Sequence, residues 1–156
     1  MSDAWEPMLL PVPDPHSRFF WESGSDGVLR MLRCAGCGFW IHPPAPVCTE
    51  CLSRDVTPQP LSGRGIVHSF TVNHQQWSPE QLVPYVIVLV ELAEQPGLRL
   101  TSSLVEIDPV AASSLVVPDP VPAHPTTVTI GLPVRVLFTE RSGVFVPLFT
   151  PVTPAT

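Results

Sequence analysis

Two CxxC motifs lie close together in this chain and constrain its fold more than any other feature. The first pairs Cys34 with Cys37, the second pairs Cys48 with Cys51, and residues 38–47 separate them. Two residues between paired cysteines let both thiolates converge on one ion, and two such pairs complete a tetrahedral site. Four thiolates leave no open coordination position, so we predict a structural metal site and not a catalytic one.

Zinc is the metal that this ligand set favours, and iron of the rubredoxin kind or a pair of disulfides are the alternatives. His42 lies between the motifs, but with four cysteines available we expect it at the surface or in packing. Glycine relieves the tight turn of the first motif at Gly36 and Gly38. In the second motif, Leu52 stands where a following glycine would be expected.

The composition favours short strands and rigid loops over long helices. Of 156 residues, 44% are hydrophobic, 14% are charged and 21 are prolines, whereas about 25% of residues are charged in an average soluble protein. A chain of this length holds one ordinary domain, or a small domain with a metal-stapled appendix.

The charge balance argues against a general nucleic-acid binder. All eight basic residues are arginines, against 14 acidic residues, and the net charge is -6. Binding to phosphates relies on many cationic contacts, which this chain does not offer. The longest apolar run, residues 85–90, is six residues, whereas a membrane helix needs about 20. With no signal-peptide pattern either, we expect a soluble, cytoplasmic protein.

Strand patterns occur on both sides of the cysteine motifs. Residues 28–33 and 39–42 are predicted to flank the first motif as strand and return strand, and strict alternation begins near residue 66. Five strands connected by short hairpins, with one long proline-rich connection, suit a small Greek-key barrel of the OB type. An SH3-like barrel has a similar strand count and remains an alternative. The five predicted strands lie near residues 66–74, 85–92, 98–107, 134–139 and 144–149.

A short helix is predicted before the first motif, with Asp14 as its N-cap and Pro15 in its first turn. Phe19, Phe20 and Trp21 are consecutive in it, and a helix spreads consecutive residues around its circumference. We therefore predict that at least one of these three residues contacts a partner protein. The alternative is that two of them cover the neighbouring domain.

No catalytic constellation is evident in the sequence. It contains no hydrolase nucleophile elbow, phosphate-binding loop, zinc-protease motif or dinucleotide fingerprint. His68 and His74 share one face of a predicted strand but lie about 20 Å apart along it, too far to act as a pair. A binding or scaffolding role is therefore expected.

The order of these features resembles the zinc-ribbon and OB-fold acyl-CoA-associated proteins, domain-of-unknown-function family thirty-five. The resemblance covers roughly residues 15–150 and implies a short N-terminal helix, a rubredoxin-like zinc ribbon and a C-terminal five-stranded OB-fold barrel, a mainly β fold. The segments that carry it are Phe20-Trp21-Glu22, residues 29–37, residues 43–51, Ser62-Gly63-Arg64-Gly65-Ile66-Val67-His68, Val83-Pro84-Tyr85 and Ile130-Gly131-Leu132-Pro133-Val134.

Members of this family are generally non-catalytic partners of thiolase-like enzymes that act on acyl-CoA thioesters. The resemblance thus implies an accessory subunit, most specifically of a lipid-transfer-protein-like aldolase of steroid side-chain degradation, in a hetero-oligomer. The alternatives are a stand-alone acyl-CoA binding module and, less favoured, a single-stranded nucleic-acid binder. Direct binding of CoA is weakly supported, because the barrel segment has few cations: Arg64, Arg99, Arg135 and Arg141.

The predicted organisation has four parts. Residues 1–27 form a tail and helix, residues 28–57 the zinc ribbon, residues 58–150 the barrel, and residues 151–156 a second tail. The connection at residues 109–129 is longer and richer in proline than in the family pattern, and we expect an extended loop there that serves a specific partner.

Overall fold

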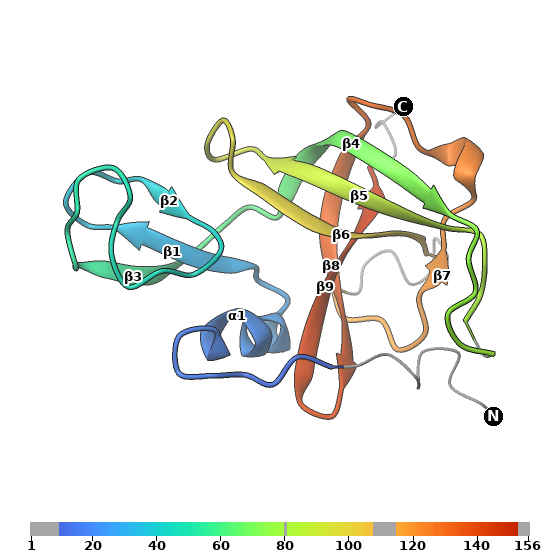
Figure 1. Cartoon of the computed structure of the whole chain (residues 1–156), viewed down its shortest axis with the longest axis horizontal. Helices are drawn as coiled ribbons and strands as arrows, with labels where there is room; N and C mark the ends of the chain where they lie inside the picture. The colour runs from blue at the N-terminus through green and yellow to red at the C-terminus, as the bar shows by residue number, and fades with distance from the viewer. Residues whose placement is uncertain (1–9, 80, 108–114, 153–156) are drawn as a thin grey trace.

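The computed structural model describes residues 10–79, 81–107 and 115–152. A small three-stranded sheet lies to one side of a larger barrel, and a short helix lies beneath the junction between them (Figure 1). This is the predicted mainly β fold. The elements are α1 (Arg18–Glu22), η1 (Ser23–Asp26), β1 (Arg30–Cys34), β2 (Trp40–Ile41), β3 (Val56–Pro60), β4 (Arg64–Asn73), β5 (Tyr85–Leu92), β6 (Arg99–Glu106), β7 (Val121–Pro122), η3 (Pro125–Thr127), β8 (Pro133–Arg141) and β9 (Val144–Pro151).

The small sheet carries the cysteine motifs. Strand β1 lies between β2 and β3 and pairs antiparallel with both. Strand β3 was not predicted, because Pro58 and Pro60 interrupt its pattern. It forms at the edge of the sheet, where a proline can occur without breaking a ladder on both sides.

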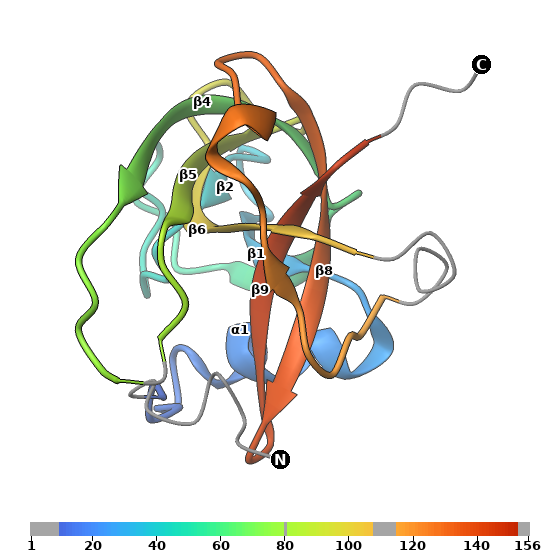
Figure 2. The ribbon, with the colours of Figure 1, turned by 90° about the vertical axis from the view of Figure 1, so that its right-hand side faces the viewer.

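Five strands close the larger unit into a barrel. Their order is β5-β4-β8-β9-β6, and the pairing of β5 with β6 closes the ring. Strands β6 and β9 run parallel, with Leu104 opposite Phe149. Seen from the side, β4 and β5 curve across one end of β8 and β9 (Figure 2). This Greek-key order is the five-stranded OB barrel that we predicted.

The alternation predicted for the first barrel strand is interrupted by a β-bulge. Val67 pairs with Val90 and Ser69 with Leu89, so His68 is the extra residue. Val67 is fully buried, whereas Ile66 and Phe70 are exposed. The residues that share a face in a regular strand are therefore not the core residues here.

The proline-rich connection packs more closely on the barrel than the extended loop that we predicted. Of residues 109–129, only 115–129 are described, and they include β7, which pairs with β6, and η3. Val117, Ala123 and Val128 are buried against the barrel. Proline rigidity thus serves contacts within this chain, and the proposed partner-specific role for the segment stays a prediction.

The N-terminal helix begins later than predicted. Asp14 Oδ1 accepts hydrogen bonds from the N–H groups of His16 and Ser17, both at 2.8 Å, and so closes a turn. The helix itself starts after Ser17, which occupies the N-cap position without a side-chain cap. Gly27, at φ 76°, ends the helical segment in the left-handed region.

Candidate functional site

The four predicted ligands meet at one point of the small sheet. Their Sγ atoms all lie within 4.8 Å of one another. Cys34 Sγ is 3.5 Å from Cys51 Sγ, and Cys37 Sγ is 3.6 Å from Cys48 Sγ. Zinc with four thiolates at about 2.3 Å places the sulfurs about 3.8 Å apart. The donor set and its spacing therefore fit a tetrahedral metal ion.

The backbone builds both motifs in the same way. The N–H of Gly38 donates to the carbonyl of Cys34 at 2.8 Å, and the N–H of Leu52 donates to the carbonyl of Cys48 at 3.1 Å. Both donors have positive φ, 78° for Gly38 and 61° for Leu52. The second motif therefore holds a bulky residue in the left-handed region, at the position where we noted a missing glycine.

Cys34 is electrostatically prepared to be a thiolate. The hydrogen bond from the Cys37 backbone N–H is the largest cause that lowers its pKa, which is about 6 against the ordinary 9.0. Burial opposes this shift, and the Cys51 side chain and the Gly36 N–H add to it. The thiolate is the form that binds a metal, so these donors favour the metal-bound state.

Gln95 joins the ribbon to the barrel. Its side-chain oxygen accepts from the backbone N–H of Trp40 at 2.8 Å, and its side-chain nitrogen donates to the Trp40 carbonyl at 3.1 Å. The side-chain amide of Gln95, in the β5–β6 turn, thereby satisfies backbone hydrogen-bonding groups on the outer edge of strand β2. No sequence pattern indicated this residue, because 55 positions separate the two partners.

Two further contacts fix the same junction. Glu94 accepts a hydrogen bond from the Ser62 N–H at 2.6 Å, where the chain passes from ribbon to barrel. His42 packs against Phe20 with ring centroids 5.3 Å apart. Burial lowers the His42 pKa, and its Nδ1 atom has no hydrogen-bond partner within the described residues. As expected, His42 serves packing and lies outside the four-thiolate cluster.

All three helix aromatics pack against the main core. Phe20 is buried in the main core, and Phe19 and Trp21 are half-buried against it. Phe20 and Trp21 meet edge to face at 4.9 Å. Phe20 is therefore core as the structure stands, and the assignment of Phe19, Phe20 and Trp21 to a partner interface stays a prediction.

Two of the four barrel arginines form ion pairs, and the other two are neighbours in the sheet, since Arg64 lies opposite Arg135 where β4 pairs with β8. Arg99 pairs with Glu91 at 3.2 Å and Arg141 with Asp119 at 3.5 Å. The two histidines of the first barrel strand region, His68 and His74, are both exposed.

Family comparisons cover most of the chain. A model described as "ChsH2, rubredoxin-like zinc ribbon domain" matches residues 21–57, and one described as "ChsH2, C-terminal OB-fold domain" matches residues 58–139. The chain belongs to the ChsH2 family. Together with the geometry of the four thiolates, this membership makes the cluster of Cys34, Cys37, Cys48 and Cys51 the zinc site of a rubredoxin-like ribbon.

Two curated relatives are hydratase subunits. A "Probable enoyl-CoA hydratase alpha subunit" of Thermomonospora curvata is 38% identical over 99 residues, which are 64% of this chain and 30% of that protein. The "3-oxo-4,17-pregnadiene-20-carboxyl-CoA hydratase alpha subunit" of Mycobacterium tuberculosis is 34% identical over 133 residues, 85% of this ChsH2-family chain and 37% of that protein. The chain spans about a third of the length of these relatives.

Solved structures agree with the fold. A chain of the "Ltp2-ChsH2(DUF35) aldolase" has a TM-score of 0.74 and 32% identity, and the match covers 92% of this chain and 100% of that one. A DUF35-family protein of Sulfolobus solfataricus has a TM-score of 0.56 and 15% identity over 88% of this chain and 86% of its own. Within the described residues, no helix has the length and apolar character needed to cross a bilayer.

Proposed function

We propose that this chain is a non-catalytic accessory subunit that binds and stabilises a thiolase-like enzyme acting on acyl-CoA thioesters. The carrying observation is the match of 92% of this chain to the whole of one chain of the "Ltp2-ChsH2(DUF35) aldolase", at 32% identity. The steroid CoA ester in the name of the mycobacterial relative supports the narrower proposal, an aldolase of steroid side-chain degradation. The partner supplies the reacting groups.

The chemistry of the described residues supports a role without catalysis in this chain. Four thiolates close the coordination of the metal, so no open position is left for a substrate. The hydratase activity in the relatives' names belongs to proteins about twice as long as this chain, and most of each relative lies outside the matched segment. We therefore assign no hydratase activity to this chain.

The junction between ribbon, helix and barrel supports a scaffolding role. Gln95, Glu94 and the pair of His42 and Phe20 hold these parts in one arrangement. A subunit that presents a composite surface needs such fixed geometry, because a mobile surface must lose more entropy on docking. We propose a ribbon of residues 28–57 and a barrel of residues 58–150 as the two units so presented.

The test is co-expression with a candidate thiolase-like protein. We expect the two proteins to elute together and the retro-aldol cleavage of the acyl-CoA substrate to require this chain. Trp21→Ala should weaken association roughly tenfold or more, the usual effect of losing an aromatic anchor. Ile130→Ala, at a residue 72% exposed outside the helix, is the matched control. Separate elution, with activity indifferent to this chain, would contradict the proposal.

A further inference from the structure

Strand β4 has one edge that is only partly used. On one side it pairs with β5 along residues 65–73. On the other side it pairs with β8 only at residues 64–66, and Val67 extends this pairing by two hydrogen bonds with the segment 131–132. Within the described residues, no strand pairs with residues 69–73 on that side. Figure 2 shows this part of β4 at the outer margin of the barrel, where it curves away from β8.

Phe70 lies beside this free edge. It pairs with Val88 of β5, which is fully buried inside the barrel. Directly opposite residues of an antiparallel ladder lie on the same face of the sheet, so Phe70 also points to the inner side. It is nevertheless 39% exposed. We attribute this exposure of an inward-facing aromatic side chain to the absence of a neighbouring strand among the described residues.

The free edge lacks the features that normally prevent strands from pairing edge to edge. Soluble proteins protect such edges with charged residues, proline or bulges. Residues 69–73 include no charged residue and no proline, and the bulge of β4 at His68 lies before them. Each of these five residues is exposed or half-buried. Their outward backbone N–H and C=O groups are therefore suited to pair with another extended chain.

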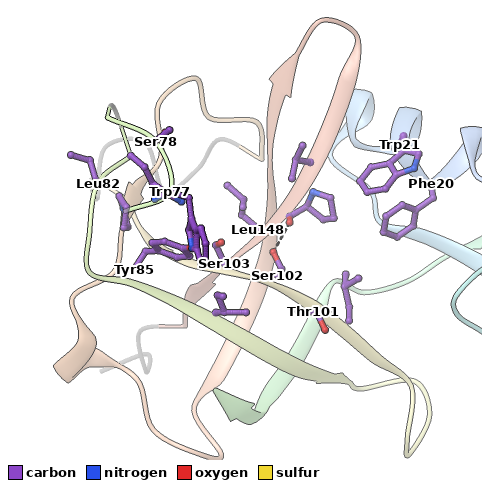
Figure 3. Close-up of a pocket in the computed structure, with 16 residues that line it drawn as sticks. Phe20, Trp21, Trp77, Ser78, Leu82, Tyr85, Thr101, Ser102, Ser103 and Leu148 are labelled. Carbon is purple, nitrogen blue, oxygen red and sulfur yellow. Dashed lines mark hydrogen bonds between the residues drawn. The ribbon is translucent and has the colours of Figure 1, made fainter. Parts of the chain in front are cut away.

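This edge is separate from the pocket on the outer face of the barrel. That pocket lies between the β4–β5 loop, α1 and the strands β5, β6, β7 and β9 (Figure 3). None of the residues that line it belongs to β4. Leu82 of the loop lines the pocket and is 54% exposed. It therefore offers an exposed apolar control for variants at the β4 edge.

The edge is complementary to itself in an antiparallel register centred on Thr71. Because paired residues share a face of the sheet, an inward residue must lie opposite an inward residue of the second copy. A two-fold axis at Thr71 meets this condition, since it places Phe70 opposite Val72 of the second copy. An aromatic and a β-branched residue form a favourable cross-strand pair, as do the two threonines at the axis. An axis at Phe70 or Val72 would leave part of the segment unpaired.

We propose that β4 joins two copies of this chain edge to edge, through residues 69–73 and a two-fold axis at Thr71. The sheets of the two barrels are then continuous across the axis, and each copy covers Phe70 of the other. This part of β4 lies at the end of the barrel away from the ribbon (Figure 1), so the four thiolates stay outside the contact. The inference goes beyond the accessory role and does not depend on it, because it concerns two copies of this chain alone.

Sedimentation equilibrium of the full zinc-loaded chain without any partner tests the contact. We expect a monomer–dimer equilibrium with a dissociation constant on the order of 10–100 μM, since one strand pair buries less area than a standard stable interface. Phe70→Lys should raise this constant roughly tenfold or more, because it places a charge at the pairing edge. Leu82→Lys adds the same charge away from β4 and should leave the constant unchanged. Thermal unfolding of each variant verifies folding.

Cysteine cross-linking tests the register and does not require removal of Phe70. Thr71→Cys should give a disulfide-linked dimer with oxidised glutathione, because residues that meet at the axis have Cα atoms about 5 Å apart. Ser69→Cys is the matched control, since Ser69 and Thr71 are both exposed. The two copies of residue 69 would lie more than about 12 Å apart along the strands, beyond disulfide reach. The unmutated chain measures any cross-linking by the four native cysteines.

Three outcomes would overturn the proposal. These are a monomer at all concentrations up to about 0.5 mM, equal dissociation constants for Phe70→Lys and the unmutated chain, and equal cross-linking of Ser69→Cys and Thr71→Cys. A strand of the thiolase-like enzyme is the competing occupant. If Phe70→Lys reduces co-elution with that enzyme while the unmutated chain alone stays monomeric, the edge belongs to the enzyme and the proposal is wrong. Co-elution of the unmutated chain tests the accessory role separately.

Discussion

The side-chain amide of Gln95 forms both a donor and an acceptor hydrogen bond with the backbone of Trp40, at 3.1 and 2.8 Å. It imitates the next strand of the ribbon sheet, although it belongs to the barrel. Together with the Glu94–Ser62 hydrogen bond and the packing of His42 on Phe20, this contact fixes how the ribbon lies on the barrel.

Replacing Gln95 tests this junction. Gln95→Ala leaves the Trp40 N–H and carbonyl without their partners, and we expect a loss of about 1–3 kcal/mol in the free energy of unfolding. The control is Gln59→Ala on the exposed edge strand β3, which should change stability by less than about 0.5 kcal/mol. Urea unfolding measures both. Equal stability of the two variants would rule out an energetic role for the Gln95 contact.

Removal of the metal should affect the ribbon far more than the barrel. We expect Cys34→Ser to lower bound zinc well below one ion per chain and to weaken partner binding, because three thiolates cannot close the site. Zinc is measured by mass spectrometry. The barrel should keep most of its strand signal in circular dichroism, since the main core consists mostly of barrel residues, with Met31 and Trp40 from the ribbon strands, and is distinct from the cluster around Cys34 and Cys48. Full zinc content with an unchanged melting profile would contradict this prediction.

The burial of His42 predicts that the free energy of unfolding decreases in mildly acidic solution. Burial lowers its pKa below the ordinary 6.5, so the unfolded chain binds a proton more readily than the folded chain. Its contribution to stability is therefore present above about pH 6.5 and is lost as the pH falls below that value. His42→Phe should reduce the pH dependence of the free energy of unfolding between pH 5 and 7. Parallel unfolding curves for both proteins throughout this interval would show that His42 does not titrate as argued.

Alanine substitutions at Gly63 and Gly97 distinguish the stability cost of a steric contact from that of backbone strain. Both have positive φ, 73° and 80°, but a Cβ on Gly63 would lie within 2.4 Å of Val136 Cγ1, and one on Gly97 would meet nothing within 4 Å. We expect Gly97→Ala to cost about 1 kcal/mol from strain alone. Gly63→Ala should cost about 1–3 kcal/mol more from overpacking. Equal losses in the two variants would show that the contact with Val136 is relieved without cost.

The sequence predicted most of the fold because its signals are local. Spacing alone located the metal site, and alternation near residue 66, a continuous β-rich run at residues 85–92 and the turn residues between segments indicated five barrel strands. Strand β3 escaped prediction because Pro58 and Pro60 are tolerated only at an edge, and an edge position depends on the assembled sheet. The exposure of Ile66 depends on the bulge at His68, which is a property of two paired strands.

The parts of the site that could not be predicted are long-range. Gln95 reaches Trp40 across 55 positions, and a pocket on the outer face of the barrel combines a loop, the helix and four strands. The hydrophobic periodicity of a single segment carries no information about contacts between distant segments. The three aromatic residues that the sequence singled out in the helix differ in burial, with Phe20 in the core and Phe19 and Trp21 partly buried against it.

The topology also implies an order of events during synthesis. All pairings of the ribbon sheet lie between residues 30 and 60, whereas barrel closure brings Arg64 beside Arg135 and Leu104 beside Phe149. Local contacts form quickly, and distant ones must await the rest of the chain. On the ribosome, the ribbon is therefore complete and able to capture its metal while the last strands of the barrel have yet to be translated.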